Sequence, residues 1–280
     1  MLANTKTSEY FAQVKRHQRV GDFIVAHSTN SSNIYEEASS LLSFHEPITL
    51  LDIGCGYGNF TKALIPKLKP GSTCHGLDCR INFIEPFTEI VKAAGLRGKF
   101  FAIEAERMNL LASHSYDLVA AAFSLYFFPH QLNEIKRILK PNGILLAITH
   151  SNQGLNEFFD DLRGVIKSIA GRENIIFDIE RKVASFCEEN CLEFLRPHFE
   201  IVRMNEHPNQ LVFNRDDMED LLYYLDFRLD VMSEEEFLGD DLELNILKHE
   251  FFNHIRKRLR TKGIYTLNKE DAIFIGKHPK

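Results

Sequence analysis

The chain has 280 residues, of which 44% are hydrophobic, and it carries a formal net charge of −6. This length holds one large α/β domain with additions, or two smaller domains. The acidic balance argues against nucleic-acid and anionic-membrane partners, because both select a basic surface. The longest apolar run, at 118–129, is too short to cross a bilayer. Five cysteines without a framework spacing and no recognisable leader segment predict a reduced, cytoplasmic protein.

The order of predicted elements begins with two helical stretches in residues 1–48, one around Tyr10 and Phe11 and the other from Ile34. Short apolar runs then alternate with amphipathic segments. The predicted strands are 49–53, 73–77, 99–103, 116–122 and 144–149, and the predicted helices between them are 60–68, 83–94 and 129–139. Such alternation is typical of a mostly parallel sheet with helices on both faces and right-handed crossovers.

A glycine-rich turn follows the first predicted strand. Gly54, Gly56 and Gly58 stand at every second position, and Asp52 precedes the first of them by two residues. Glycine is needed where the backbone takes a positive φ or where a ligand lies against the main chain. The spacing differs from the Gly-x-Gly-x-x-Gly of pyrophosphate-binding folds, and the carboxylate suits a cationic ligand better than a pyrophosphate. The pattern resembles motif I of the class I S-adenosylmethionine-dependent methyltransferases.

The resemblance implies a three-layer Rossmann-like sheet of about seven mostly parallel strands, with an antiparallel edge strand and a helical cap. It places Gly54, Gly56 and Gly58 under the methionine part of the cofactor. Asp78 ends the second strand, where an acidic residue takes the ribose hydroxyls in dinucleotide folds as well. The further cofactor-binding residues that we predict are Asp52, Glu104 beside the adenine, and Phe123. By the same resemblance, Tyr10 and Phe11 are candidates for a lid over the cofactor or for plain packing.

The carboxyl ends of the fourth and fifth strands carry Tyr126 and His150, which we predict as catalytic residues. Each has a structural alternative, since two aromatics here can seal the core and a lone histidine is often structural. The chain lacks the Pro-Pro-aromatic run of enzymes that methylate base amines and the Pro-Cys pair of cytosine C5 enzymes. Metal-dependent relatives place carboxylates where this chain has Ser124 and His150. We therefore predict no metal site.

We predict that residues 1–48 form a helical cover and that residues 49–150 form the cofactor-binding core. The remaining segment, 151–280, is expected to complete the sheet and to insert a helical cap over the substrate. All three segments are expected to form one compact unit. The predicted elements of 151–280 are strands at 200–205 and 210–213, helices at 216–227 and from about 242, and a final hairpin-like pair at 265–267 and 272–276. Asp271–Lys277 fits the antiparallel edge strand of the class. A run of twelve carboxylates at 216–243 and the basic residues of 256–262 form either a solvated, self-pairing face or a selector of a charged substrate.

The predicted function is methyl transfer from S-adenosylmethionine to nitrogen or oxygen of a small molecule, with S-adenosylhomocysteine as product. Two alternatives stay open. One is methylation of a protein or an RNA, which only the basic residues of 256–262 favour. The other is a partner subunit that binds the cofactor without catalysis.

Overall fold

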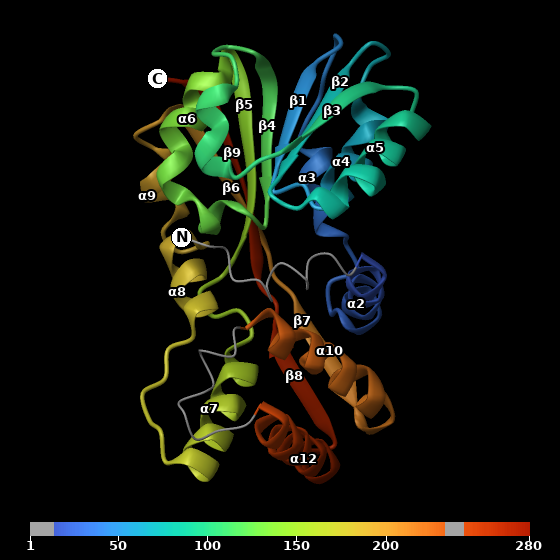
Figure 1. Cartoon of the computed structure of the whole chain (residues 1–280), viewed down its shortest axis with the longest axis vertical. Helices are drawn as coiled ribbons and strands as arrows, with labels where there is room; N and C mark the ends of the chain where they lie inside the picture. The colour runs from blue at the N-terminus through green and yellow to red at the C-terminus, as the bar shows by residue number, and fades with distance from the viewer. Residues whose placement is uncertain (1–13, 233–243) are drawn as a thin grey trace. The chain divides into compact units, whose positions relative to one another are not determined.

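The structure is a computed structural model that describes residues 14–232 and 244–280. Its chain divides into two compact units, each assembled from segments far apart in the sequence (Figure 1). Unit 1 contains residues 1–31, 153–181 and 208–270. Unit 2 contains residues 32–152, 182–207 and 271–280. The lid candidates Tyr10 and Phe11 lie outside the described residues.

Unit 2 is built on a seven-stranded sheet in the order β3-β2-β1-β4-β5-β9-β6. The strands are β1 (Thr49–Ile53), β2 (Thr73–Asp78), β3 (Arg97–Ala102), β4 (Tyr116–Ala122), β5 (Leu139–His150), β6 (Phe199–His207) and β9 (Asp271–Pro279). Neighbouring strands are parallel except at β9, which runs antiparallel to both β5 and β6. The predicted Rossmann-like sheet is therefore confirmed, and its antiparallel strand lies one place in from the edge.

Helices cover both faces of this sheet. Figure 1 shows α3 (Ile34–Ser40), α4 (Asn59–Leu64) and α5 (Ile84–Ala93) on one face, and α6 (Leu132–Ile138) and α9 (Cys191–Leu195) on the other. Because both faces are covered, the central strand β1 buries side chains in both directions, and Leu50, Leu51 and Ile53 are all fully buried. The predicted three-layer arrangement follows from this double burial.

The strand order reverses between β1 and β4, which are neighbours in the sheet. In open α/β sheets such a reversal leaves a crevice at the carboxyl ends of the strands, and ligands bind there. The glycine turn after β1 and the carboxyl ends of β2, β4 and β5 all lie at this edge. The sheet topology therefore positions most of the predicted site residues at the carboxyl ends of neighbouring strands, on one side of the sheet.

Unit 1 consists of helices and one two-stranded ribbon. Its helices are α2 (Val14–His27), α7 (Asn156–Ala170), α10 (Met218–Val231) and α12 (Leu244–Lys262), and its ribbon pairs β7 (Gln210–Asn214) with β8 (Ile264–Asn268). The boundary between the units at 181/182 falls within α8 (Asp178–Ser185). α12 buries Leu247, Phe251, Ile255 and Leu259, which are spaced four residues apart on one side of the helix. This stripe packs into a core shared with α7, α10 and the ribbon.

Two features of the fold differ from the sequence prediction. The predicted hairpin-like pairing of 265–267 with 272–276 is wrong, because β8 pairs with β7 in one sheet and β9 pairs with β5 and β6 in another. The two N-terminal helices also belong to different units, α2 to unit 1 and α3 to unit 2. A cover at 1–48, a cofactor-binding core at 49–150 and a substrate cap within 151–280 stay predictions.

Candidate active site

The turn after β1 contains three glycines in the left-handed region, with φ of +66° at Gly54, +51° at Gly56 and +87° at Gly58. Residues with a Cβ adopt this region only at a cost, so glycine suits all three positions. The backbone N–H of Gly54 donates to the carbonyl of Leu77 on β2 at 2.7 Å, which anchors the turn to the sheet. The predicted glycine pattern is therefore one continuous bend between β1 and α4.

The three glycines differ in their surroundings. A Cβ on Gly54 would lie 2.4 Å from the Cβ of Ser124, and a Cβ on Gly58 would lie 3.2 Å from the ring of Phe87. A Cβ on Gly56 would meet no atom of residues 14–232 or 244–280 within 4 Å. Gly54 and Gly58 therefore allow close packing inside unit 2, whereas Gly56 leaves the main chain open to a ligand.

Asp78, at the end of β2, contacts the open part of this turn. Its Oδ2 accepts a hydrogen bond from the backbone N–H of Gly56 at 3.0 Å, and its Oδ1 accepts one from the N–H of Arg80 at 3.0 Å. Burial raises the pKa of Asp78 and outweighs these two hydrogen bonds, which lower it. Each carboxylate oxygen has a second lone pair, so the group can still accept hydrogen bonds from a ligand.

Asp52 is buried, with 1% of its surface exposed, and its Oδ2 accepts a hydrogen bond from the Thr61 hydroxyl of α4 at 2.8 Å. Burial raises the pKa of Asp52 to about 7, although the hydrogen bond from Thr61 opposes this shift. This carboxyl therefore links β1 to α4. A contact between Asp52 and a cofactor stays a prediction.

Glu104 follows β3 and precedes a 3-10 turn at Ala105–Leu110. Its side chain is exposed, while Ala105 and Met108 are buried. The structure places it near Cys79, whose thiol pKa it raises after the larger effect of burial. The predicted role of Glu104 beside the adenine stays a prediction.

Phe123 links the glycine turn to the carboxyl end of β5. It has a φ of +56°, a strained value for a residue with a side chain, and its N–H donates to the carbonyl of Ile148 at 2.8 Å. The next residue, Ser124, donates its hydroxyl to the carbonyl of Ile53 at 2.6 Å. The ring of Phe123 stacks on the ring of His150, with centroids 4.7 Å apart and an interplanar angle of 26°.

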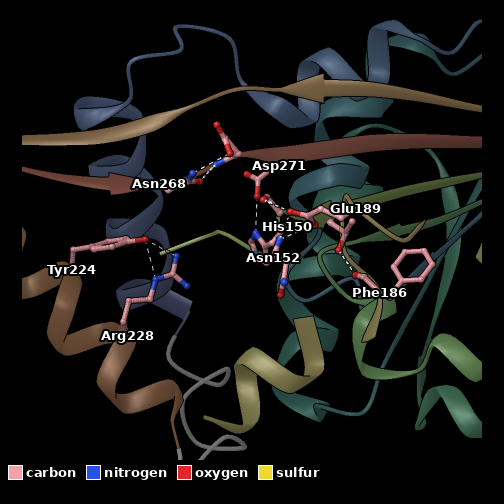
Figure 2. Close-up of polar contacts among 11 residues, drawn as sticks. His150, Asn152, Phe186, Glu189, Tyr224, Arg228, Asn268 and Asp271 are labelled. Carbon is pink, nitrogen blue, oxygen red and sulfur yellow. Dashed lines mark hydrogen bonds and ion pairs between the residues drawn. The ribbon is translucent and has the colours of Figure 1, made fainter. Parts of the chain in front are cut away.

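His150, the last residue of β5, pairs in register with Asp271, the first residue of β9. Its Nδ1 lies 2.6 Å from Oδ1 of Asp271, whose side chain is 3% exposed, while the His150 side chain is 24% exposed (Figure 2). The buried ring of Tyr126 lies 5.7 Å from the ring of His150. The two predicted catalytic residues are therefore brought together beside Phe123.

The end of β5 is braced by residues that sequence reasoning missed. Glu189 accepts hydrogen bonds from the Ser151 hydroxyl at 2.8 Å and from the Asn152 N–H at 2.9 and 3.0 Å (Figure 2). Burial raises the pKa of Glu189, but these hydrogen bonds outweigh burial and lower it. The hydroxyl of Thr149 donates to the carbonyl of Phe186 at 2.7 Å. Together these contacts fix the backbone that carries His150.

Tyr35 of α3 is a second neighbour that the sequence analysis did not select. Its ring meets Phe123 edge-on, with centroids 6.0 Å apart. Burial is the largest cause of a strongly raised pKa for Tyr35, and the nearby Asp271 adds to it. Neither Tyr35 nor Asp271 belongs to a local motif. Strand pairing and helix packing bring them to this edge across long sequence distances.

Two carboxylates of the charge run, Asp226 and Asp230, pair with basic residues outside 256–262, so the predicted pairing of 216–243 with 256–262 stays a prediction. Arg16 contacts Asp226 and Asp230, and Lys248 donates to the same two carboxylates at 2.8 and 2.7 Å. Arg228 donates its Nε and Nη2 to the Tyr224 hydroxyl at 3.0 and 2.7 Å (Figure 2). Part of the predicted run, 233–243, lies outside the described residues.

Residues 14–232 and 244–280 contain no group of three or more His, Cys, Asp or Glu side chains arranged to hold a metal ion. No helix in the same residues combines the length and apolar character of a membrane span. An open cleft of about 410 Å³ in unit 2 is lined by Leu41, Arg203, Met204, Asn205, Ile275 and Lys277. None of the predicted site residues lines that cleft.

Comparison with known proteins agrees with this fold and turn. The sequence profile of a methyltransferase-domain family matches residues 50–143, from β1 into β5. The crystal structure of the YcgJ protein from Bacillus subtilis superposes with a TM-score of 0.54 at 14% identity, covering 88% of this chain and 98% of that protein. The chain therefore has the fold of the class I S-adenosylmethionine-dependent methyltransferases.

Curated relatives share this region and differ in what they act on. A demethylmenaquinone methyltransferase of Bacillus cytotoxicus is 32% identical over 105 residues, which are 36% of this chain and 44% of that protein. A tRNA (guanine-N(7)-)-methyltransferase of Botryotinia fuckeliana is 29% identical over 143 residues, which are 43% of this chain and 50% of that protein. The chain thus spans about half the length of these relatives.

Proposed function

We propose that this protein is an S-adenosylmethionine-dependent methyltransferase that acts on a small molecule. The observation that carries the proposal is the contact between Gly56 and Asp78. It joins a main-chain surface with no side chain in front of it to a carboxylate that retains acceptor capacity. This is the donor and acceptor chemistry that a ligand with an amino-acid end and a ribose diol requires. When bound, S-adenosylmethionine supplies an electrophilic methyl group on a positively charged sulfur.

Three residues that follow or end strands at the carboxyl side of the sheet fit three parts of that cofactor. Gly56 accommodates the methionine part against its backbone, because no atom in the described part of the chain lies within 4 Å of where its Cβ would be. Asp78 accepts hydrogen bonds from the ribose hydroxyls, each worth roughly 1.5–3 kcal/mol when the acceptor is charged. Glu104, at the end of the next strand outward, remains the proposed contact of the adenine amino group.

The transfer end of the proposed site lies on the other side of the turn, at Phe123, Tyr126 and His150. The packing of Ser124 against Gly54 places Phe123 next to the glycine turn. Aromatic faces attract a cationic sulfur, so Phe123 and Tyr126 are suited to lie near the sulfonium. Holding an acceptor in line with the methyl group can remove roughly 7–11 kcal/mol of the barrier through positioning alone.

Two observations favour a small-molecule acceptor. The chain has a net charge of −6, and the relative from Bacillus cytotoxicus is named for a small molecule. The tRNA methyltransferase relative supports the alternative of an RNA acceptor, which needs a basic surface to bind phosphates. The two alternatives differ in how acceptor binding depends on salt. Binding of RNA, a polyanion, should weaken steeply with added salt, whereas binding of a small molecule should change little.

Calorimetric titration of S-adenosylmethionine into wild type and Asp78→Asn tests the proposal. We expect wild type to bind and Asp78→Asn to bind about 10- to 100-fold more weakly, which corresponds to one or two lost charged hydrogen bonds. Asp117→Asn is the matched control, because Asp117 pairs with Lys140 on β5 and is not among the proposed site residues. Equal affinity in wild type and Asp78→Asn would remove Asp78 from the site.

Methyl transfer itself is measured with methyl-labelled S-adenosylmethionine against fractionated small molecules, total RNA and total protein. Label in a small-molecule fraction supports the proposal. Label in RNA that disappears at high salt supports the RNA alternative. Cofactor binding with no transfer into any fraction supports the non-catalytic partner subunit.

A further inference from the structure

We propose that Asp271 is a positioning residue that holds His150 as a proton acceptor, and that the methyl acceptor is therefore an acidic hydroxyl or carbon acid. This inference rests on the proposed function and narrows its substrate class. A neutral amine already has the lone pair that attacks a methyl group, so it needs no base before transfer. A hydroxyl or a carbon acid must lose a proton to become a strong nucleophile, and the protein then has to place a base beside it.

The tautomer of His150 follows from its partner. Asp271 lies at the strand register position opposite His150, and its Oδ1 is 2.6 Å from Nδ1. A carboxylate accepts hydrogen bonds, so the proton of the neutral imidazole lies on Nδ1. The other ring nitrogen, Nε2, is then the one with the lone pair. A buried carboxylate behind Nδ1 also stabilises the imidazolium that forms when Nε2 takes a proton.

The ring of His150 is fixed in orientation by its aromatic neighbours. Phe123 stacks on it at 4.7 Å, Tyr126 lies at 5.7 Å, and Glu188 donates its backbone N–H to the carbonyl of His150 at 3.0 Å. A base that is held in one rotamer delivers proton transfer at lower entropic cost than a mobile one. The same Phe123 leads through Ser124 to Gly54 of the glycine turn, so the base lies beside the proposed cofactor site.

Unit 2 contains a second histidine–carboxylate pair that serves as an internal comparison. The Nδ1 of His207 lies 2.7 Å from Oε2 of Glu37, almost the same geometry as in the first pair. The side chain of His207 is only 4% exposed, against 24% for His150. None of the ring contacts found in the described residues involves His207, whereas His150 meets two aromatic rings. The first pair therefore has an accessible imidazole at the sheet edge, and the second is enclosed.

In the proposed step, the O–H or C–H bond of the acceptor breaks, and its proton moves to Nε2 of His150. The electron pair left on the acceptor forms the new bond to the methyl carbon, and the pair of the old carbon–sulfur bond stays on sulfur. Sulfur becomes a neutral thioether, and the imidazolium of His150, paired with Asp271, later releases its proton to water.

The first test is spectroscopic and needs neither cofactor nor acceptor. Protein labelled with ¹⁵N-histidine is compared with His150→Gln to assign the ring nitrogens of His150. We expect the neutral ring to carry its proton on Nδ1 in wild type, and a loss of this single tautomer in Asp271→Asn. A proton on Nε2 in wild type would overturn the proposal, and this measurement requires no variant of Asp271 to fold.

The second test is turnover with labelled S-adenosylmethionine and a panel of phenols, 1,3-dicarbonyl compounds and amines. We expect transfer to the phenols or dicarbonyl compounds and none to the amines. His150→Gln should lower kcat at least 100-fold and Asp271→Asn at least 10-fold, with KM changed less than threefold. His207 cannot serve as the control, because it pairs in register with Asp271 itself. The control is His114→Gln, before the amino end of β4, where Nδ1 of His114 lies 3.1 Å from the carbonyl of Leu139, and it should leave kcat unchanged.

Transfer to amines, or full turnover in His150→Gln, would overturn the inference. Calorimetry with S-adenosylhomocysteine on the same samples separates this failure from failure of the proposed function. Binding to wild type together with amine-only transfer rejects the acceptor class and leaves the methyltransferase proposal standing. Absence of binding rejects both. If the cofactor binds and no panel member is methylated, the proposed class of hydroxyl or carbon-acid acceptors is rejected. The position of the proton on the His150 ring then decides whether Asp271 positions His150.

Discussion

Unit 1 and unit 2 use their charged side chains differently. In unit 1, the buried Asp161 of α7 accepts hydrogen bonds from Tyr265 at 2.7 Å, His254 at 2.9 Å and Arg258. These partners come from α12 and β8, so one carboxylate joins three elements. Such a fully used carboxylate has little capacity left for a ligand. Its role is to hold the unit together.

In unit 2, two carboxylates lie at strand ends, Asp78 at the end of β2 and Asp271 at the start of β9. Asp78 accepts two backbone hydrogen bonds, and Asp271 meets a histidine whose ring is partly exposed. The Gly56 backbone beside Asp78 has open space in front of it. The polar contacts of Asp161 join elements of unit 1, whereas the polar groups at the carboxyl ends of the unit 2 strands are the ones proposed to bind a ligand. Substitutions in the two units should therefore separate stability from binding.

The largest expected effect is on binding, in Gly56→Val. A side chain here would occupy the space proposed for the methionine part, so cofactor affinity should fall about 1,000-fold or more, which is roughly 4 kcal/mol. The free energy of unfolding should fall by only about 1–2 kcal/mol, the cost of a positive φ without a clash. Calorimetry and urea denaturation measure the two quantities.

Gly54→Ala is the matched control for Gly56→Val. Its Cβ would lie 2.4 Å from Ser124, so this variant should lose clearly more stability than Gly56→Val. If Gly54→Ala is as stable as Gly56→Val, the packing difference between the two glycines is not what the structure indicates.

Asp161→Asn should show the opposite pattern. It leaves Arg258 without its buried carboxylate and removes charge from two further hydrogen bonds, so the free energy of unfolding should fall by roughly 2–4 kcal/mol. Cofactor affinity, measured well below the unfolding transition, should stay within twofold of wild type. A loss of affinity larger than tenfold would contradict the assignment of Asp161 to stability alone.

The pH dependence of stability should have opposite signs in the two units. Burial raises the pKa of Asp52 to about 7, so the folded state keeps this proton between about pH 4 and 7 while the unfolded state releases it. Its contribution to stability therefore falls as pH rises through that window. Burial lowers the pKa of His17 to about 4, with Arg228 adding to the shift, so its contribution falls as pH drops from about 6.5 to 4.

These opposite signs are measured as differences between each variant and wild type. Asp52→Asn should gain stability relative to wild type as pH rises from 4 to 7, by roughly 3–4 kcal/mol for a pKa that burial raises to about 7. His17→Gln should gain relative to wild type as pH falls from 6.5 to 4, by a similar amount. Parallel curves for a variant and wild type would show that the residue in question does not titrate as described.

The smallest effect should come from an exposed ion pair in unit 1. Lys167 and Glu173 lie 2.7 Å apart, but their side chains are 64% and 58% exposed. Water and salt screen such pairs, so Lys167→Ala should change the free energy of unfolding by less than about 0.5 kcal/mol. A larger loss, measured by urea denaturation, would mean that exposure is a poor guide to which charges stabilise this unit.

Much of unit 2 could be predicted because its signals are local. The run from Thr49 to Phe60 carries the buried strand, the glycine turn and the helix start within a dozen residues. Apolar runs alternating with amphipathic segments then predict a parallel sheet without knowledge of any tertiary contact. The observed strand β4 has the predicted bounds of 116–122.

The features that were missed depend on contacts between distant parts of the chain. Asp271 becomes a partner of His150 only through strand pairing across 121 positions. The hairpin prediction failed because adjacency in sequence favoured β8 with β9, whereas β8 pairs with β7, and Phe213 meets Tyr265 across that ribbon. Single-sequence periodicity predicts a strand but not its neighbour. Side chains that depend on register therefore require the structure.

The most direct test of the account is calorimetric titration of S-adenosylhomocysteine into wild type, Gly56→Val and Asp161→Asn at one pH. We expect binding to wild type, the same dissociation constant within twofold for Asp161→Asn, and no detectable binding to Gly56→Val. Absence of binding to wild type, or binding to Gly56→Val at wild-type affinity, would contradict a cofactor site on the open side of the glycine turn in unit 2.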